Sequence, residues 1–367
     1  SSKAHWKNRN PNQPFFAVFN FGITHESQIW NQGNEPLLVD PQKIPVPPVF
    51  PDTAEVRKDL AVNYSNLIRL DKQIGNLIEE LKSEGLYQNS IIFFYGDHGG
   101  PFPRYKRALY ETGIKVPLII KFPNQKRAGT KNKDLISFID YAPTVLSLAG
   151  IKPPDVMQGK AQFGPHEASE KASFIFASSD RFDEQVDRLR ALRFGTFKYI
   201  RNFNPEISNA LPVSYREQMP MMQHLNLLWE EQKLEPKSAA WFKTPKPKEE
   251  LYDLEKDPYE LENLAGKLHL QDTLDFFRKS MDKWIVETGD LGQYPEKELM
   301  ENWFPEGKPR KLTSLISKIK GGKIHLEHPD EGATIVWKKS PDSVWSVYSN
   351  ALDFNKSIEA KAVRIGY

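Results

Sequence analysis

The sequence contains no cysteine among its 367 residues. This absence excludes disulfide bonds and thiolate zinc sites within these residues, although it leaves the compartment open. No apolar run approaches the roughly 20 residues that a membrane-spanning helix needs. Charge of one sign is not in excess, because 50 basic and 48 acidic residues give a net charge of +2. The sequence therefore shows no electrostatic footprint of a nucleic-acid-binding protein.

The first third of the chain has the order strand, helix, strand, which predicts a sheet covered by helices. Residues 15–21 and 91–95 are short apolar runs, and the second is typical of a buried parallel strand. Residues 56–86 carry apolar side chains at helical spacing, with Gly85 as a C-terminal cap. A proline-rich segment, residues 29–51, predicts a long loop before this helix.

Chemically useful side chains follow directly after the second of these strands. Asp97 and His98 stand where the chain leaves the sheet, and ligands commonly bind beyond strand ends in such folds. Carboxylate and imidazole are both good metal ligands. Lys106 lies further along the same loop, between Arg104 and Arg107. A pair of metal-ligating residues and a basic cluster on one loop indicate a site for a tetrahedral oxyanion.

This block resembles the second half of a type I sulfatase, the formylglycine-dependent family within the alkaline phosphatase superfamily. In that family an Asp-His or Asp-Asn pair binds calcium, and a Lys on the next loop contacts the sulfate. Other segments match the family and keep its order: residues 15–25, 70–75, 105–113, 116–119, 139–144, 250–258 and 262–264. The resemblance runs from about Phe15 to about Leu264.

The resemblance implies roles for four residues. Asp97 and His98 would hold one calcium ion, with its remaining ligands supplied from elsewhere. Lys106 and His25, the latter at the end of the first predicted strand, would be catalytic: both would stabilise charge on the sulfate, and one would serve the leaving oxygen.

Substrate contacts are a further expectation of the resemblance. We expect Arg104 to face the substrate, together with Asp180, Arg181 and Asp183 from a charged segment between two predicted strands. That charged segment is also compatible with a simple salt-bridged turn. The nearby aromatic residues Trp229, Trp241 and Phe242 are expected to pack rather than to bind sugar.

Several family features have no match in these residues. The formylglycine nucleophile derives from Cys or Ser in a C/S-x-P-S-R motif, and no Ser here precedes a Pro by two positions. The family's N-terminal Asp-Asp metal pair and its K-x-H pair also lack a match. We therefore expect the C-terminal portion of a longer enzyme, which needs an upstream segment to complete its site and is inactive alone.

The expected fold class is α/β, with the C-terminal half of an alkaline-phosphatase-like sheet flanked by helices at residues 1–165. A smaller α+β subdomain with an antiparallel sheet is predicted at 166–299. A linker at 300–311 leads to a short all-β, sandwich-like module at 312–367. Alternating apolar residues predict the strands of that module, and it resembles modules appended to some glycosidases and bacterial sulfatases.

The function expected from the resemblance is hydrolysis of sulfate esters on a polysaccharide or oligosaccharide. The substrate would be an algal glycan such as ulvan or carrageenan, or a glycosaminoglycan, and the enzyme would be periplasmic or secreted. Two alternatives stay open. One is a phosphodiesterase or phosphonate hydrolase of the same superfamily, which would carry a second metal and more histidines. The other is a non-catalytic, sugar-binding pseudosulfatase.

Overall fold

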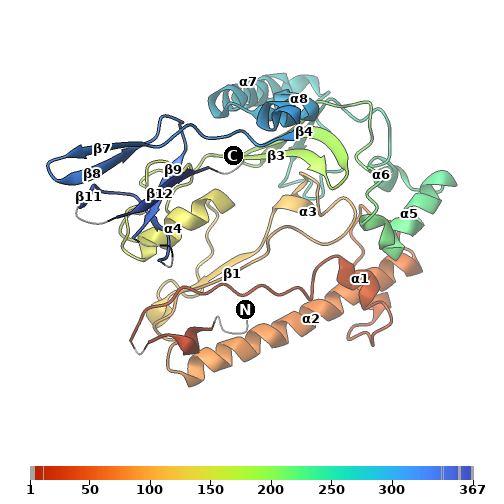
Figure 1. The fold of residues 1–367 in the computed structure, drawn as a ribbon. Helices are drawn as coiled ribbons and strands as arrows, with labels where there is room; N and C mark the ends of the chain where they lie inside the picture. The colour runs from red at the N-terminus through yellow and green to blue at the C-terminus, as the bar shows by residue number, and fades with distance from the viewer. Residues whose placement is uncertain (1–4, 11, 340, 342, 354–356, 365–367) are drawn as a thin grey trace. The chain divides into compact units, whose positions relative to one another are not determined.

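The computed structural model describes residues 5–10, 12–339, 341, 343–353 and 357–364. The chain forms two compact units, Ser1–Trp284 and Ile285–Tyr367. The elements of both are drawn in Figure 1. The finer division at residues 165, 299 and 311 stays a prediction.

The long helix α2, Ala54–Ser83, is the longest element of the first unit (Figure 1). Thr53 caps its start by accepting a hydrogen bond from the Val56 N–H, and Gly85 ends it with a φ of 68°. Its buried residues include Leu60 and Ala61, and the helix packs against helices α1, Ser27–Asn31, and α5, Pro220–Glu230. The helix predicted from apolar spacing is confirmed.

The strand β1, Ile92–Tyr95, pairs antiparallel with β2, Leu118–Lys121, and this corrects the prediction of a parallel strand. Apolar character predicts a strand but not the direction of its neighbour. Residues 15–21 form no strand in this structure, although one was predicted, because they take no ladder partner. Phe16 and Val18 remain 76% and 61% exposed.

The loop between β1 and β2 folds back on itself through two close backbone approaches. The Gly99 N–H donates to the Gly113 carbonyl at 2.8 Å. A Cβ on Gly99 would lie 1.8 Å from the Thr112 oxygen, and one on Gly113 would lie 2.2 Å from the Tyr105 oxygen. Only glycine fits at these two positions, so the loop that carries Asp97 through Lys106 has a defined shape.

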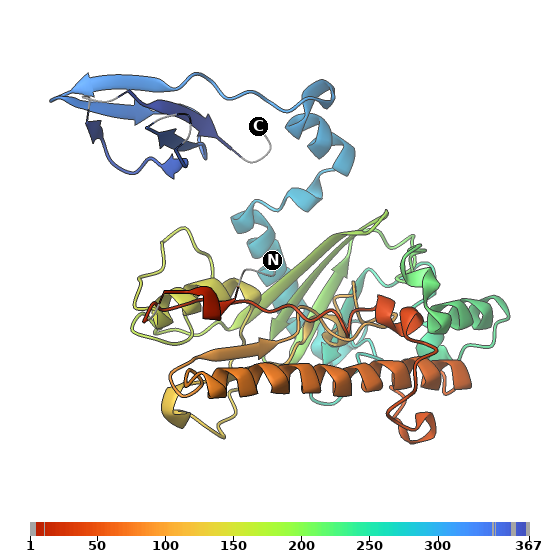
Figure 2. The same ribbon diagram turned by 60° about the horizontal axis from the view of Figure 1, so that its bottom comes forward.

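A four-stranded antiparallel sheet, shown in Figure 2, follows in the order β3-β4-β5-β6. Its strands are β3 Phe174–Phe182, β4 Gln185–Phe194, β5 Phe197–Asn202 and β6 Glu249–Asp253. Helix α7, Gln271–Thr288, packs Phe277 against Tyr199 of the sheet. The predicted hairpin around Gly195 and the predicted helix after residue 268 are both confirmed. The short helices of this unit are α3 Glu111–Ile114, α4 Tyr141–Leu148 and α6 Pro236–Ala239.

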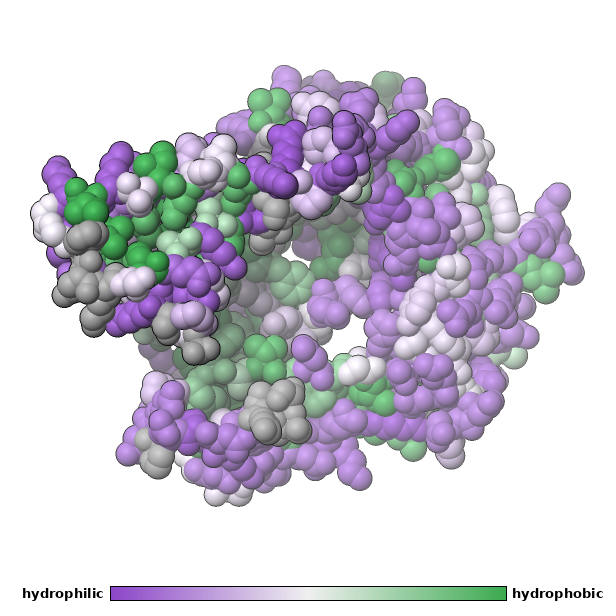
Figure 3. Space-filling model, viewed as in Figure 1, coloured by the Kyte–Doolittle hydropathy of each residue, from purple (hydrophilic) through white to green (hydrophobic). Residues whose placement is uncertain are grey.

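The second unit contains helix α8, Glu296–Trp303, and two three-stranded antiparallel sheets of order β11-β8-β7 and β10-β9-β12. The strands are β7 Ile316–Lys320, β8 Lys323–Glu327, β9 Thr334–Lys338, β10 Ser346–Val347, β11 Leu352–Asp353 and β12 Glu359–Val363. Figure 3 shows apolar side chains, in green, over this β region, where Ile319 and Val347 are exposed. β7 and β11 were not predicted.

Together these elements make a mixed α/β protein with antiparallel sheets, and the predicted fold class is confirmed. No helix within the described ranges is both long and apolar enough to cross a lipid bilayer.

Candidate functional site

Lys106 meets His25 and Glu26 at the start of helix α1. The Lys106 Nζ lies 3.2 Å from His25 Nε2 and 2.7 Å from Glu26 Oε1. Its side chain keeps 19% of its surface exposed. The structure therefore brings together the two predicted catalytic residues, which stand 81 positions apart in the sequence.

The two ring nitrogens of His25 have different partners. An ammonium group has only donors, so the Nε2 that contacts Lys106 must accept. The Nδ1 lies 2.9 Å from Ser27 Oγ and 3.3 Å from the Ser27 backbone nitrogen. Burial and the neighbouring Lys106 charge hold the pKa of His25 below its ordinary value, which favours the neutral form.

Glu26 is a buried carboxylate that sequence reasoning missed. It is 1% exposed and accepts two hydrogen bonds from the Arg107 guanidinium, at 2.8 and 2.9 Å. Burial by itself would raise the pKa of Glu26, but the hydrogen bonds from Arg107 and Lys106 outweigh burial and lower the pKa. An ionised Glu26 therefore fixes both cations. The signal for Glu26 that the sequence offered was its position directly after His25, a predicted catalytic residue.

Lys106 retains capacity for an anion. An ammonium group has three N–H donors, and the contacts with His25 and Glu26 use two of them. Arg107, in contrast, is engaged by Glu26 and by Asp183, whose Oδ2 lies 2.6 Å from its Nε. Within the described part of the chain, Lys106 is thus better suited than Arg107 to donate to a bound oxyanion.

Asp97 and His98 directly follow strand β1, on the same loop as Lys106. His98 Nδ1 lies 2.8 Å from the Gly99 carbonyl oxygen, so it carries the proton and leaves the Nε2 lone pair available. That Nε2 stands 3.8 Å from Asp97 Oδ1, and the Asp97 side chain is 90% exposed. Two ligands of one calcium ion, each about 2.4 Å from it, have a comparable spacing.

The fit to calcium is partial. No group of three or more His, Asp or Glu side chains suited to a metal ion occurs in the described ranges. Calcium takes six to eight oxygen ligands, by a general rule. The Asp97 and His98 pair therefore matches a fraction of a calcium site.

The predicted substrate residues take different places. Arg104 is 6% exposed, stacks 4.0 Å over the Tyr110 ring and donates to the Glu260 carbonyl at 2.8 Å. This placement favours a structural role for Arg104 over contact with a substrate, because its guanidinium points into the protein. The sequence could not show this, because Glu260 lies 156 residues away.

The charged segment before β4 is partly an ion-pair network, as the alternative reading of a salt-bridged turn proposed. Asp180 holds the fully buried Arg190 through contacts of 2.8 and 3.2 Å. Asp183 bonds Arg107, and Arg181 donates to the Asp183 carbonyl at 3.1 Å. Asp183 thus reaches the Lys106 and Glu26 cluster, whereas Asp180 is tied to the sheet.

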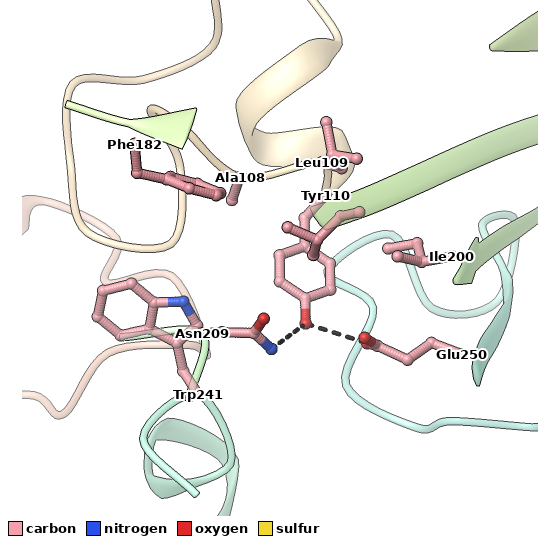
Figure 4. Close-up of a pocket in the computed structure, with 9 residues that line it drawn as sticks. Ala108, Leu109, Tyr110, Phe182, Ile200, Asn209, Trp241 and Glu250 are labelled. Carbon is pink, nitrogen blue, oxygen red and sulfur yellow. Dashed lines mark hydrogen bonds between the residues drawn. The ribbon is translucent and has the colours of Figure 1, made fainter. Parts of the chain in front are cut away.

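A small cavity of about 20 Å³ lies behind the basic loop (Figure 4). Tyr110 lies in it, donating to Glu250 at 3.0 Å and accepting from Asn209 at 3.3 Å. The cavity has room for about one water molecule, so it cannot hold a sugar.

Known proteins are similar to this chain over most of its length. The Sulfatase family matches residues 3–151, and the C-terminal region of N-sulphoglucosamine sulphohydrolase matches residues 96–210. An ulvan-active sulfatase of Formosa agariphila is 38% identical over 410 positions, covering 100% of this chain and 69% of that protein. The N-sulphoglucosamine sulphohydrolase of Homo sapiens is 26% identical over 291 positions, covering 75% of this chain and 57% of that protein.

Two solved structures match parts of this chain. A protein in complex with its substrate D-glucosamine-2-N, 6-O-disulfate gives a TM-score of 0.49 at 19% identity, covering 67% of this chain and 45% of that one. A phosphonate monoester hydrolase of Agrobacterium radiobacter gives 0.44 at 19% identity, covering 63% and 42%. The identity with the Formosa protein over the whole of this chain decides the assignment. The chain belongs to the sulfatase family.

Proposed function

We propose that this protein hydrolyses sulfate esters on a sulfated polysaccharide or oligosaccharide, with Lys106 as the main sulfate-binding residue of this chain. The observation that carries the proposal is the Lys106 ammonium group, held by His25 at 3.2 Å and by Glu26 at 2.7 Å with one N–H left. A fixed cation of this kind stabilises an oxyanion at little reorganisation cost.

The residues around Lys106 have separate roles in sulfate binding. Lys106 donates to a sulfate oxygen and offsets the negative charge that develops as the sulfur–oxygen bond breaks. His25 accepts from Lys106, and Glu26 binds both Lys106 and Arg107, so these two residues aim the ammonium group. Asp183 secures Arg107 from the opposite side.

Two groups outside these residues complete the proposal. A calcium ion, held in part by Asp97 and His98, would supply Lewis-acid stabilisation of the sulfate oxygens. A formylglycine hydrate from outside these 367 residues would supply the nucleophile.

The substrate class rests on the relatives. The Formosa relative, by its name, acts on ulvan, and the human relative acts on N-sulphoglucosamine. We propose an algal glycan of the ulvan type first, because the identity of 38% with the ulvan-active protein is the higher. Export to the periplasm or the medium stays a prediction that no feature of the fold tests.

The test is a calorimetric titration of the full 367-residue chain with inorganic sulfate at low ionic strength. Lys106→Ala should weaken binding at least tenfold, because it removes the donor. The matched control is Lys115→Ala, an exposed lysine after α3 that should leave affinity within twofold. Equal affinities of the wild-type chain and Lys106→Ala would overturn the proposal.

A further inference from the structure

One aromatic side chain stands at the edge of the Lys106 site. The Tyr215 ring lies 6.1 Å from the His25 ring, measured between centroids, and remains 37% exposed. Trp241 and Phe242 are instead buried, at 6% and 7% exposure, and Trp229 stacks on Phe242 at 5.5 Å. Tyr215 thus combines an accessible surface with a place beside the proposed sulfate-binding group.

The Tyr215 ring is held in place from two sides. Trp30 of helix α1 meets it edge-on at 5.3 Å with an interplanar angle of 75°. The loop before Tyr215 is tied to the β3–β4 turn, because the Ser214 N–H donates to Glu184 at 2.7 Å and Gln185 donates to the Pro212 carbonyl at 2.8 Å. The ring needs little ordering when a ligand arrives, which favours binding.

Burial decides on which side a substrate can extend. Glu26 closes one side of Lys106, because its carboxylate is 1% exposed and bound to Arg107. A sugar joined to a sulfate on Lys106 extends away from Glu26, and the partly exposed Tyr215 ring lies beside His25, the other partner of Lys106. The apolar face of an aromatic ring suits the C–H face of a pyranose.

We propose that Tyr215, supported by Trp30, is a stacking subsite for the pyranose ring that carries the sulfate group. This inference rests on the proposed function, since Lys106 places the sulfate. It assigns substrate selection in part to the loop before residue 216, far in sequence from Asp97 and Lys106.

Three probes separate the subsite from the sulfate group: a sulfated ulvan disaccharide, the same disaccharide after desulfation, and inorganic sulfate. Each is titrated against the full chain by calorimetry. Tyr215→Ala should weaken both disaccharides roughly fivefold to tenfold and leave inorganic sulfate within twofold. Tyr215→Phe should retain wild-type affinity for all three. Tyr294→Ala, which removes an exposed aromatic in the second unit, is the control and should change nothing.

A second variant tests whether the loss of affinity results from a folding defect. Tyr215→Leu keeps apolar volume but removes the ring, so it should reproduce the loss while its circular dichroism matches the wild type. Unchanged disaccharide affinity in both variants would overturn the subsite. An equal loss of affinity for inorganic sulfate would also overturn it, because it would mean that Tyr215 only holds His25 in position.

The same titrations tell the two proposals apart. A chain that binds neither disaccharide contradicts the subsite. A chain that binds both disaccharides equally, with inorganic sulfate unaffected by Lys106→Ala, contradicts the sulfate-binding role and leaves the aromatic subsite standing.

Discussion

Glu26 shows how one buried charge organises the site. Taking a carboxylate out of water is costly, and the cost is recovered only when cations and hydrogen bonds meet it. Arg107 meets it with two bonds and Lys106 with a third contact. The two basic residues in turn avoid mutual repulsion, because the charge of Glu26 lies between them.

Glu26→Gln should lower the free energy of unfolding by roughly 3 kcal/mol, because it leaves Arg107 facing an amide in a buried place. Urea denaturation of the full chain measures the change. Glu35→Gln, at an exposed position nine residues later, is the matched control and should stay within about 0.5 kcal/mol of the wild type. A Glu26 variant as stable as the Glu35 variant would show that the buried pair adds nothing.

At the scale of elements, helices α2 and α5 meet through a buried carboxylate. Asp59 of α2 is 1% exposed and accepts a 2.7 Å hydrogen bond from the Met221 N–H in the first turn of α5. Burial raises the pKa of Asp59 to about 7, against the bond from Met221, which lowers it. The contact that positions α5 is therefore sensitive to pH.

The sign of this sensitivity follows from linkage. A carboxyl group with a raised pKa in the folded state adds stability below its unfolded pKa and loses it as pH rises through about 7. Asp59→Asn cannot ionise and can still accept from Met221. The variant should match the wild type near pH 4 and exceed its stability at pH 8, by up to a few kcal/mol. Thermal melts of both proteins across this range check it, and parallel pH profiles would contradict it.

For the whole molecule, Asp97 and His98 are the proposed calcium ligands, and the described residues hold no group of three or more His, Asp or Glu side chains suited to a metal ion. We expect the 367-residue chain to bind calcium weakly and to release no sulfate by itself. Adding 1 mM calcium should stabilise it by about 0.4 kcal/mol or less, as for a dissociation constant of 1 mM or above. Differential scanning calorimetry with calcium and with chelator, beside a sulfate-release assay, tests both statements.

Two results would contradict this expectation. One is a calcium-induced stabilisation of several kcal/mol that Asp97→Ala abolishes, since it would mean a complete site. The other is sulfate release by the isolated chain, which would place a nucleophile within these residues.

The sequence alone was sufficient for elements that depend on local pattern. The apolar spacing of α2 and the glycine turn between β4 and β5 are short-range features, so the helix and the hairpin were predicted correctly. Motif order also brought His25 and Lys106 into one hypothesis. The pairing of β1 was predicted wrongly, because strand direction depends on a partner that the local run does not name.

The tertiary structure alone decided which side chains meet. Glu26 and Arg107 are 81 residues apart, and Arg104 turns away from the site toward Glu260, 156 residues along the chain. Tyr215 lies beside His25, and the loop before it is tied to the β3–β4 turn, so three distant segments meet here. Motifs state which chemistry is available. Burial and contacts between distant segments, which set the cost of each charge, decide where that chemistry is placed.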